Sequence, residues 1–403
     1  MGYEENDVWM PSTPDKNVCH RCVIDSALAE KVKADSSGRR RCSYCNRFGA
    51  APLQTLVDAV LDGIGHEWTD PVDELMYIGR EGGYQGDVTD GEDLVRWEID
   101  PFTTNEDITD DVAESLQHLS FTKRDYGLLF RHEALDFAWS DFAEQVKHRT
   151  RYLFLTVDDD DDHPDHIPPG RMLTVLGGEV QRVGCTRVLH KGSTLVRVRV
   201  DAAPAVHRTA EALGSPPPAA ARWPNRMSPA GIPMFYAALE RRTALAETMD
   251  PTRDASRVAT VGTWVATRDL LFLDLTGIGP VPSLFEEERR HLRGAIRFLR
   301  RFSAEVSKPI SEDEEHLEYV PTQIVTEYFR HAYRTDGGAA LDGILYRSSR
   351  TGEPACVIFA EPDDCGEWDG SGTAPTTPLL LLLTQQVERL DGTDALNLVM
   401  TGR

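Results

Sequence analysis

Long apolar runs are missing from this sequence of 403 residues. No segment approaches the roughly 20 consecutive apolar residues that a membrane-spanning helix needs. Residues 1–6 also lack the basic and apolar regions of a secretory signal peptide. We therefore expect a cytoplasmic protein without a membrane partner.

Basic residues are few, since 43 Lys and Arg stand against 66 Asp and Glu, which gives a formal net charge of -23. Such a charge disfavours general attraction to nucleic acid or to anionic membranes, although a local basic patch remains compatible with it. Arg39, Arg40 and Arg41 form such a patch. A solvated loop is the simpler explanation for it, so nucleic acid is not the expected partner.

Cysteines are also few, and their spacing does not fit a disulfide-stapled secreted domain. Three of the seven, Cys185, Cys356 and Cys365, are scattered and are expected to be free thiols. No internal repeat with a period of 20 to 50 residues is present, which excludes a repeat architecture. The chain is too long for one ordinary core, so we expect at least two domains.

The other four cysteines form two CxxC pairs, Cys19 with Cys22 and Cys42 with Cys45. Each pair can present two thiolates to one ion, and the 19 residues between Cys22 and Cys42 leave room for a hairpin or a short helix. Four sulfur ligands predict Zn²⁺ in a closed site. Because no open coordination position or general base is nearby, we expect this zinc to be structural.

Composition and periodicity divide the chain into four parts, and together they predict an α+β protein. The expected parts are a zinc-binding segment at 1–50, a helical domain at 51–157, an acidic proline-bearing linker at 158–170, and a mixed domain of strands and helices at 171–403. An apolar stripe at helical spacing begins the helical domain, with Leu53, Leu56, Val57, Val60, Leu61 and Ile64 on one face.

In the last part, alternating apolar segments predict strands and two helices. The expected strands are 195–200, 234–238, 261–266, 270–275, 344–346, 356–359 and 379–383, with 261–266 and 270–275 paired to each other; the expected helices are 289–302 and one entered through Pro321.

Several sequence blocks in this part occur in a fixed order. They are 213–218 (LGSPPP), 225–238 (NRMSPAGIPMFYAA), 243–247 (TALAE), 319–323 (YVPTQ) and 342–348 (DGILYRS). Together they closely resemble the RES domain, a family named for its arginine, glutamate and serine. The front half, with its CxxC pairs, looks like the HEPN-type amino-terminal domain that often precedes a RES domain.

The resemblance implies a fold akin to that of ADP-ribosyltransferases and an enzyme that consumes NAD+, by phosphorolysis or by hydrolysis. Such proteins are often the toxin of a toxin–antitoxin pair, so an antitoxin or a regulatory protein is an expected partner. Inorganic phosphate is the co-substrate if the enzyme is a phosphorylase. The sequence leaves open whether phosphate or water is the acceptor, which partner or trigger acts, whether the amino-terminal domain inhibits or senses, and which oligomer forms.

The same resemblance assigns roles to individual residues. Glu247 is the expected catalytic carboxylate, because breaking the bond between nicotinamide and ribose develops positive charge on the sugar. Arg226, Tyr236 and Ser348 complete the expected catalytic and substrate-binding set.

Two further arginines are candidates for the diphosphate. Guanidinium groups bind diphosphates bidentately, which makes Arg197 or Arg199 a candidate beside Arg226. We expect the alternation of the strand to select one of the first two, with Arg197 slightly favoured.

The sequence also allows two other functions to be considered for its front half. Catalytic HEPN domains are ribonucleases that use an arginine and a histidine four to six residues further on, and no such pair lies between residues 50 and 155. The nearest, Arg124 and His132, are too far apart. The second alternative is an adaptor that binds nucleic acid or a protein through the zinc ribbon and has an inactive RES half. The presence of Arg226, Tyr236, Glu247 and Ser348 disfavours it.

Overall fold

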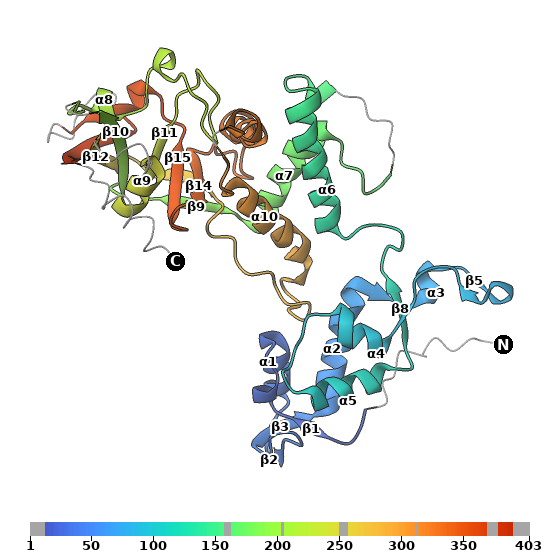
Figure 1. Ribbon diagram of the computed structural model, residues 1–403. Coiled ribbons are helices and arrows are strands. Elements are labelled where there is room, and N and C mark those ends of the chain that lie inside the picture. The colour runs from blue at the N-terminus through green and yellow to red at the C-terminus, as the bar shows by residue number, and fades with distance from the viewer. Residues whose placement is uncertain are drawn as a thin grey trace. The chain divides into compact units, whose positions relative to one another are not determined.

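The computed structural model describes residues 13–156, 163–202, 205–249, 257–311, 313–368 and 378–389. The chain divides into two compact units (Figure 1). Unit 1 consists of Met1–Leu129 and Pro280–Gly294, and unit 2 of Phe130–Gly279 and Ala295–Arg403. Helices and strands are mixed, as the sequence predicted. Residues 158–162 of the expected linker lie outside the described residues, and the four-part division remains a prediction.

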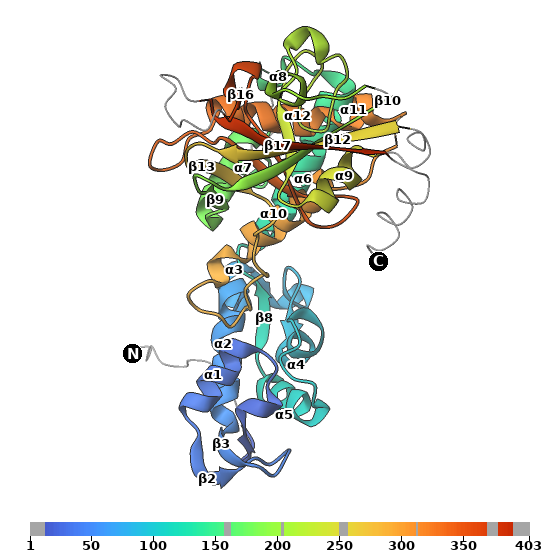
Figure 2. The ribbon, with the colours of Figure 1, turned by 90° about the vertical axis from the view of Figure 1, so that its left-hand side faces the viewer.

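Unit 1 contains short strands around one long helix (Figure 2). Its elements are β1 Asn17–Val18, η1 His20–Cys22, α1 Ser26–Ala34, β2 Ser37–Arg41, β3 Phe48–Pro52, α2 Leu53–Glu67, β4 Trp68–Thr69, α3 Pro71–Glu74, β5 Tyr77–Ile78, η2 Gly79–Glu81, β6 Gly83–Tyr84, β7 Thr89–Asp90, α4 Gly91–Asp93, η3 Leu94–Glu98, α5 Glu106–Leu116, β8 Ser120–Lys123 and η7 Arg290–Leu292.

Helix α2 is the centre of unit 1, and the predicted apolar stripe is confirmed except at Leu61, which is half-buried. Leu53, Leu56, Val57, Val60 and Ile64 are fully buried on one face of it. A 3.6-residue period places these side chains in one line, which is why the stripe is legible in the sequence.

The segment Pro280–Gly294 packs within unit 1 against α2. A Cβ at Gly63 would lie 2.3 Å from Cδ1 of Phe285, so only glycine leaves room for this ring. Arg293 is buried and donates to Glu67 at 3.2 Å and to Asp100 at 3.1 Å. A buried guanidinium needs such partners, because an unpaired charge would cost several kcal/mol.

Unit 2 consists of one large sheet and the helices that pack on it. Its elements are α6 Arg131–Glu144, η4 Gln145–Arg149, η5 Phe154–Thr156, α7 Pro169–Val183, β9 Thr186–Leu189, β10 Thr194–Ala202, α8 Ala210–Leu213, η6 Pro218–Ala220, β11 Phe235–Ala238, α9 Arg241–Thr248, β12 Arg257–Ala266, β13 Leu270–Asp274, α10 Arg293–Val306 (its first two residues being assigned to unit 1), α11 Glu315–Glu318, α12 Val320–Glu327, η8 Tyr328–Ala332, β14 Gly343–Arg347, β15 Pro354–Ile358, η9 Pro362–Asp364, β16 Cys365–Glu367 and β17 Leu380–Arg389.

The sheet has nine strands in the order β16-β17-β12-β10-β11-β15-β14-β13-β9. Neighbouring strands are antiparallel except for β13 with β14 and β16 with β17, which are parallel. All seven predicted strands are present. The expected pairing of 261–266 with 270–275 is wrong, because β12 pairs with β10 and β17 while β13 pairs with β9 and β14.

The two faces of the sheet bury different cores. The first face packs on apolar residues of α6, α7, α10 and α12, among them Phe142, Leu176, Phe302 and Val325. The second face packs on α8 and contains Phe235, Trp264 and Phe272. Because successive side chains of a strand point to opposite faces, the buried apolar residues of the strands divide between these two cores.

No described helix is both long enough and apolar enough to cross a membrane.

Candidate functional site

Strand β11 and helix α9 place two of the predicted site residues. Tyr236 lies between Phe235 and Ala237, which belong to the second core, and packs against the first core instead. Helix α9 buries Ala244 and Leu245 in the first core, whereas the side chain of Glu247 is exposed. The junction therefore leaves one carboxylate accessible on the face of the sheet that carries Tyr236.

Ser348 follows β14 directly, is buried, and contacts Glu247. Its hydroxyl donates to Oε1 of Glu247 at 2.5 Å. Oγ of Ser348 in turn accepts hydrogen bonds from the backbone N–H groups of Arg350 and Thr351, both at 3.2 Å. With its one proton given to Glu247 and its lone pairs occupied, the hydroxyl is arranged to orient the carboxylate rather than to attack a substrate.

A second contact ties α9 to the turn after β14. The hydroxyl groups of Thr243 and Thr351 lie 3.1 Å apart, and Thr243 is fully buried. Thr351 thus contacts Ser348 through its backbone and α9 through its side chain. The position of Glu247 is consequently fixed at two points along one short helix.

Arg226 lies in the loop before β11, which α12 holds in place. Thr322 donates to the carbonyl of Arg226 at 2.6 Å, and Gln323 donates to the carbonyl of Asn225 at 2.8 Å. Both donors belong to the block 319–323 noted in the sequence. A function for that block is thus visible, since it anchors the backbone on each side of the Arg226 peptide.

The guanidinium of Arg226 is only partly satisfied. Nη2 donates to the carbonyl of Lys308 at 2.7 Å, and the group lies 5.2 Å from the ring centroid of Tyr319. Nη1 is buried and has no hydrogen-bond partner among the described residues. A buried, unpaired guanidinium nitrogen is costly, and it is a feature that a bound anion would relieve.

Two phenols, on strands β11 and β14 with β15 between them, share this environment. The Tyr236 hydroxyl lies 2.8 Å from the Ser228 hydroxyl, and burial raises the pKa of Tyr236 to about 12. Burial also raises the pKa of Tyr346 well above its ordinary value, with Glu247 and Tyr236 adding to the rise and Arg226 opposing it. Glu247, Tyr236 and Arg226 therefore act electrostatically on one phenol, Tyr346, which stays neutral.

The structure does not bring Arg197 and Arg199 to this place. Residues two apart in a strand lie on the same face, so the alternation of β10 cannot select one of them, contrary to our expectation. Both extend over the second face of the sheet. Arg197 donates to the carbonyls of Leu213 and Tyr236, each at 2.8 Å, and Arg199 donates to the carbonyl of Ala212.

These two arginines thus bind the carboxyl-terminal carbonyls of α8. A cation near a helix carboxyl terminus satisfies carbonyls that lack a partner within the helix. The Arg197 guanidinium also lies 4.9 Å from the ring centroid of Phe235, in the second core. Burial lowers its pKa to about 10, and the Arg199 charge acts in the same direction.

Sequence reasoning missed four residues of the site. Tyr346, Ser228, Thr243 and Thr351 all contact or influence the predicted set. Tyr346 was detectable from the sequence, because it lies two residues before Ser348. Side chains two residues apart in an extended segment point to the same face of a sheet. Thr351 was not detectable, since its contact with α9 depends on tertiary structure.

In unit 1 the four predicted cysteines gather into one cluster. All four Sγ atoms lie within 4.8 Å of one another. Cys19 directly precedes the turn η1 and Cys22 is its last residue, while Cys42 and Cys45 occupy the turn between β2 and β3. In that turn Cys42 donates its N–H to the carbonyl of Arg47 at 2.8 Å.

The donor set fits a tetrahedral zinc ion. A Zn–S bond of about 2.3 Å in a tetrahedron separates neighbouring sulfurs by about 3.8 Å. The observed Sγ distances are 3.7 Å for Cys19 and Cys22, 3.5 Å for Cys19 and Cys45, and 3.9 Å for Cys22 and Cys42. Burial raises the pKa of the Cys19 and Cys22 thiols, so a cation is needed to hold these sulfurs as thiolates.

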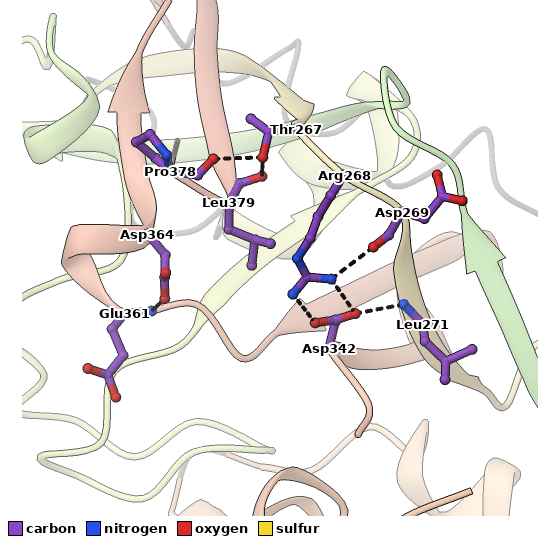
Figure 3. A network of polar contacts seen from close by, with 9 residues as sticks. All are labelled: Thr267, Arg268, Asp269, Leu271, Asp342, Glu361, Asp364, Pro378 and Leu379. Carbon is purple, nitrogen blue, oxygen red and sulfur yellow. Dashed lines mark hydrogen bonds and ion pairs between the residues drawn. The ribbon is translucent and has the colours of Figure 1, made fainter. Parts of the chain in front are cut away.

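A pocket of about 510 Å³ opens at the end of β14 opposite to Ser348. Its lining residues are Thr267, Arg268, Arg330, His331, Leu341, Asp342, Phe359, Asp364 and Leu379. Figure 3 shows the Arg268 guanidinium pointing at the Asp342 carboxylate, with Nη2–Oδ1 at 2.6 Å and Nη1–Oδ2 at 3.0 Å. None of the predicted site residues lines this pocket. The charges of Arg268 and Asp342, which do line it, neutralise each other.

Comparisons with known proteins find two family matches. Residues 35–160 match the family described as HEPN/RES N-terminal domain 1, and residues 194–375 match the RES domain. No curated protein and no solved structure matches the chain. Arg226, Tyr236, Glu247 and Ser348 all fall inside the second match. The chain thus carries a RES domain behind an HEPN/RES N-terminal domain.

Proposed function

We propose that this protein degrades NAD+ by cleaving the bond between nicotinamide and ribose, at the site formed by Glu247, Ser348, Tyr236 and Arg226. The RES domain is consistent with an enzyme of this general type. The observation that carries the proposal is the exposed carboxylate of Glu247, held by the buried hydroxyl of Ser348 at 2.5 Å. An oriented and accessible carboxylate is what a reaction through a cationic sugar requires.

Glu247 supplies negative charge next to the ribose. Cleavage of the glycosidic bond gives the sugar oxocarbenium character, and a fixed carboxylate stabilises that charge without reorganising during the reaction. Nicotinamide departs as a neutral molecule and needs no general acid. The same carboxylate is available to orient the ribose hydroxyls or to activate the incoming nucleophile.

Arg226 and Tyr236 bind the rest of the dinucleotide. The buried Nη1 of Arg226 lacks a partner among the described residues and is suited to a diphosphate oxygen. The phenol of Tyr236 is neutral because burial raises its pKa to about 12. Its ring is therefore available to pack against nicotinamide or ribose, while its hydroxyl is shared with Ser228. Arg197 and Arg199 are left out of this proposal, because they extend over the second face of the sheet, where they donate to carbonyl oxygens of the protein.

The acceptor is either water or inorganic phosphate, and one experiment separates the two. The full chain is incubated with NAD+ in the presence and absence of phosphate, and the products are identified by mass spectrometry. A phosphorylase yields nicotinamide and a phosphorylated ADP-ribose only with phosphate. A glycohydrolase yields nicotinamide and ADP-ribose in both. Absence of nicotinamide release under both conditions would overturn the proposed function.

We further propose that Cys19, Cys22, Cys42 and Cys45 bind one Zn²⁺ ion with a structural role. The sulfur distances of 3.5 to 3.9 Å support tetrahedral coordination. Four protein ligands complete the coordination sphere of zinc, so no position remains for a substrate.

Unit 1 is the candidate for regulation, together with an antitoxin or another regulatory protein as partner. The support for this role is that the chain of the RES domain passes through unit 1. Pro280–Gly294 lies within the RES match but belongs to compact unit 1, where Arg290 pairs with Asp62 at 3.0 Å. A change in unit 1 therefore acts on a segment that the RES domain contributes. If Arg290→Ala lowers the stability of unit 1 without altering NAD+ cleavage, this regulatory role is contradicted.

A further inference from the structure

Strand β2 and the turn that joins it to β3 carry positive charge in a chain that is acidic as a whole. Residues 36–57 contain four arginines, Arg39, Arg40, Arg41 and Arg47, and no acidic residue, whereas the whole chain has a net charge of -23. The hairpin formed by β2 and β3 is called the arginine hairpin below. Because excess negative charge dominates the rest of the molecule, this run is a local exception rather than a general property.

The arginine hairpin presents these side chains to solvent. Strand β2 is an edge strand, since the sheet order is β1-β3-β2, and its residues from Gly38 to Arg41 are all exposed. The hairpin forms one end of unit 1 in both views (Figures 1 and 2). An edge position leaves the strand accessible along one whole side.

Most of these guanidinium groups have no partner within the part of the chain that the structure describes. Arg39, Arg40 and Arg47 make no side-chain hydrogen bond or ion pair there, nor does the exposed Arg21 of the first CxxC turn. A nearby acid, Asp111, is already occupied, because Lys16 and the Tyr44 hydroxyl bind it at 2.7 Å and 2.6 Å. The positive charge of the arginine hairpin is thus not neutralised locally.

An aromatic ring accompanies the charge. Phe48 lies directly opposite Arg41 in the register of β2 and β3, and its ring is 53% exposed. The Arg41 guanidinium lies 4.2 Å from the ring centroid. Arginines that bind phosphates next to an exposed aromatic that stacks on bases are the two components of sequence-tolerant nucleic-acid surfaces.

The cysteine cluster fixes the positions of these groups. Arg41 directly precedes Cys42, Arg47 lies two residues after Cys45, and Arg21 directly precedes Cys22. Their backbones therefore belong to the turns that bring the four Sγ atoms within 4.8 Å. A surface fixed in this way loses less entropy on binding than a flexible basic loop.

We propose that the arginine hairpin binds the phosphate backbone of nucleic acid. Arginine is suited to phosphate because its planar donors bind two oxygens at once, and the exposed Phe48 favours nucleic acid over an acidic protein, which offers no bases to stack. This binding is independent of NAD+ cleavage. It requires no residue of the Glu247 site and no RNA cleavage.

The test measures binding by fluorescence anisotropy with the full chain. The probes are a labelled single-stranded RNA, a labelled duplex DNA and labelled polyglutamate. The variant R39A/R40A/R47A removes three exposed guanidinium groups, and the control R80A/R149A/R208A removes three exposed arginines elsewhere, so both change the net charge equally. Zinc content and circular dichroism verify that each variant is folded.

The wild type is expected to bind nucleic acid at low salt, and the hairpin variant to bind at least about tenfold more weakly. Loss of three phosphate contacts should also reduce the slope of log affinity against log salt by about 2 to 3. The control variant should keep wild-type affinity, and both variants should keep nicotinamide release. Absence of binding by the wild type, equal loss in both variants, or equally tight binding of polyglutamate would overturn the proposal.

Discussion

The hydroxyl of Ser348 donates a hydrogen bond of 2.5 Å to the carboxylate of Glu247, across a separation of 101 residues in the sequence. Ser348 is buried and immobilised by the N–H groups of Arg350 and Thr351, whereas Glu247 is exposed. A rigid donor thus holds an accessible acceptor. This arrangement explains how a side chain on a short helix keeps one orientation next to solvent.

Replacing Ser348 with alanine should lower kcat for nicotinamide release by about 10- to 100-fold. A hydrogen bond to a charged group contributes about 1.5 to 3 kcal/mol, and each 1.4 kcal/mol corresponds to about a tenfold change in rate. The exposed neighbour Ser349 provides the matched control, because Ser349→Ala leaves the Glu247 contact intact. Steady-state kinetics of both variants give the comparison. Equal effects at the two positions would contradict the orienting role.

Substitution of Arg226 should act mainly on substrate binding. In Arg226→Lys the planar pair of donors is lost while the charge remains, so we expect KM for NAD+ to rise by about tenfold or more. Arg222→Lys, an exposed position in the same loop, should leave KM unchanged. The measurement is the dependence of initial rate on NAD+ concentration. An unchanged KM in a folded Arg226→Lys protein would remove Arg226 from the binding site.

Replacing Cys42 and Cys45 with serine should abolish zinc binding and lower the stability of unit 1. Folding of a small four-sulfur site is coupled to its metal, so loss of two ligands removes the free energy that the ion contributes. Metal content by mass spectrometry and thermal unfolding measure the two effects. Cys365→Ser, which lies outside the cluster, is the control and should keep one zinc per chain. Metal-free wild-type protein of unchanged stability would exclude a structural ion.

Tyr236 should ionise later than an ordinary tyrosine. Burial raises its pKa from 10.0 to about 12. Between these values the native state keeps a proton that the unfolded chain releases, so the contribution of Tyr236 to stability is complete below about pH 10 and is lost as the pH rises to about 12. The difference in phenolate absorbance between wild type and Tyr236→Phe reports this titration. A difference signal centred near pH 10 instead of near pH 12 would contradict burial of the phenol.

Local patterns in the sequence predicted the elements of the fold well. The stripe from Leu53 to Ile64 is legible because helix periodicity is a local property, and the strand segments are legible because apolar residues concentrate there. Which strands pair with each other was harder to predict from the sequence. Two strands joined by the short loop at residues 267–269 suggest a hairpin, yet β12 and β13 pair with strands that lie far away in the sequence.

In the candidate site, too, some residues could be predicted from the sequence, whereas contacts that depend on tertiary structure could not. The family resemblance identified Glu247, Ser348, Tyr236 and Arg226, and the structure places them in one electrostatic neighbourhood around Tyr346. Arg197 was predicted as a diphosphate ligand because it is a guanidinium donor and because the family resemblance slightly favoured it over Arg199. Its partners are the carbonyl of Leu213, which the packing of α8 on the sheet brings within reach, and the carbonyl of Tyr236 on the neighbouring strand β11.

The most direct test of the proposed function is the rate of nicotinamide release from NAD+ by the Glu247→Gln variant. Glutamine preserves the size of the side chain and still accepts the hydrogen bond from Ser348, but it removes the negative charge. The exposed Glu240, just before α9, provides the control Glu240→Gln. We expect a folded Glu247→Gln protein to lose at least about 100-fold in kcat while the control stays active. Wild-type turnover in folded Glu247→Gln would contradict the central role of this carboxylate.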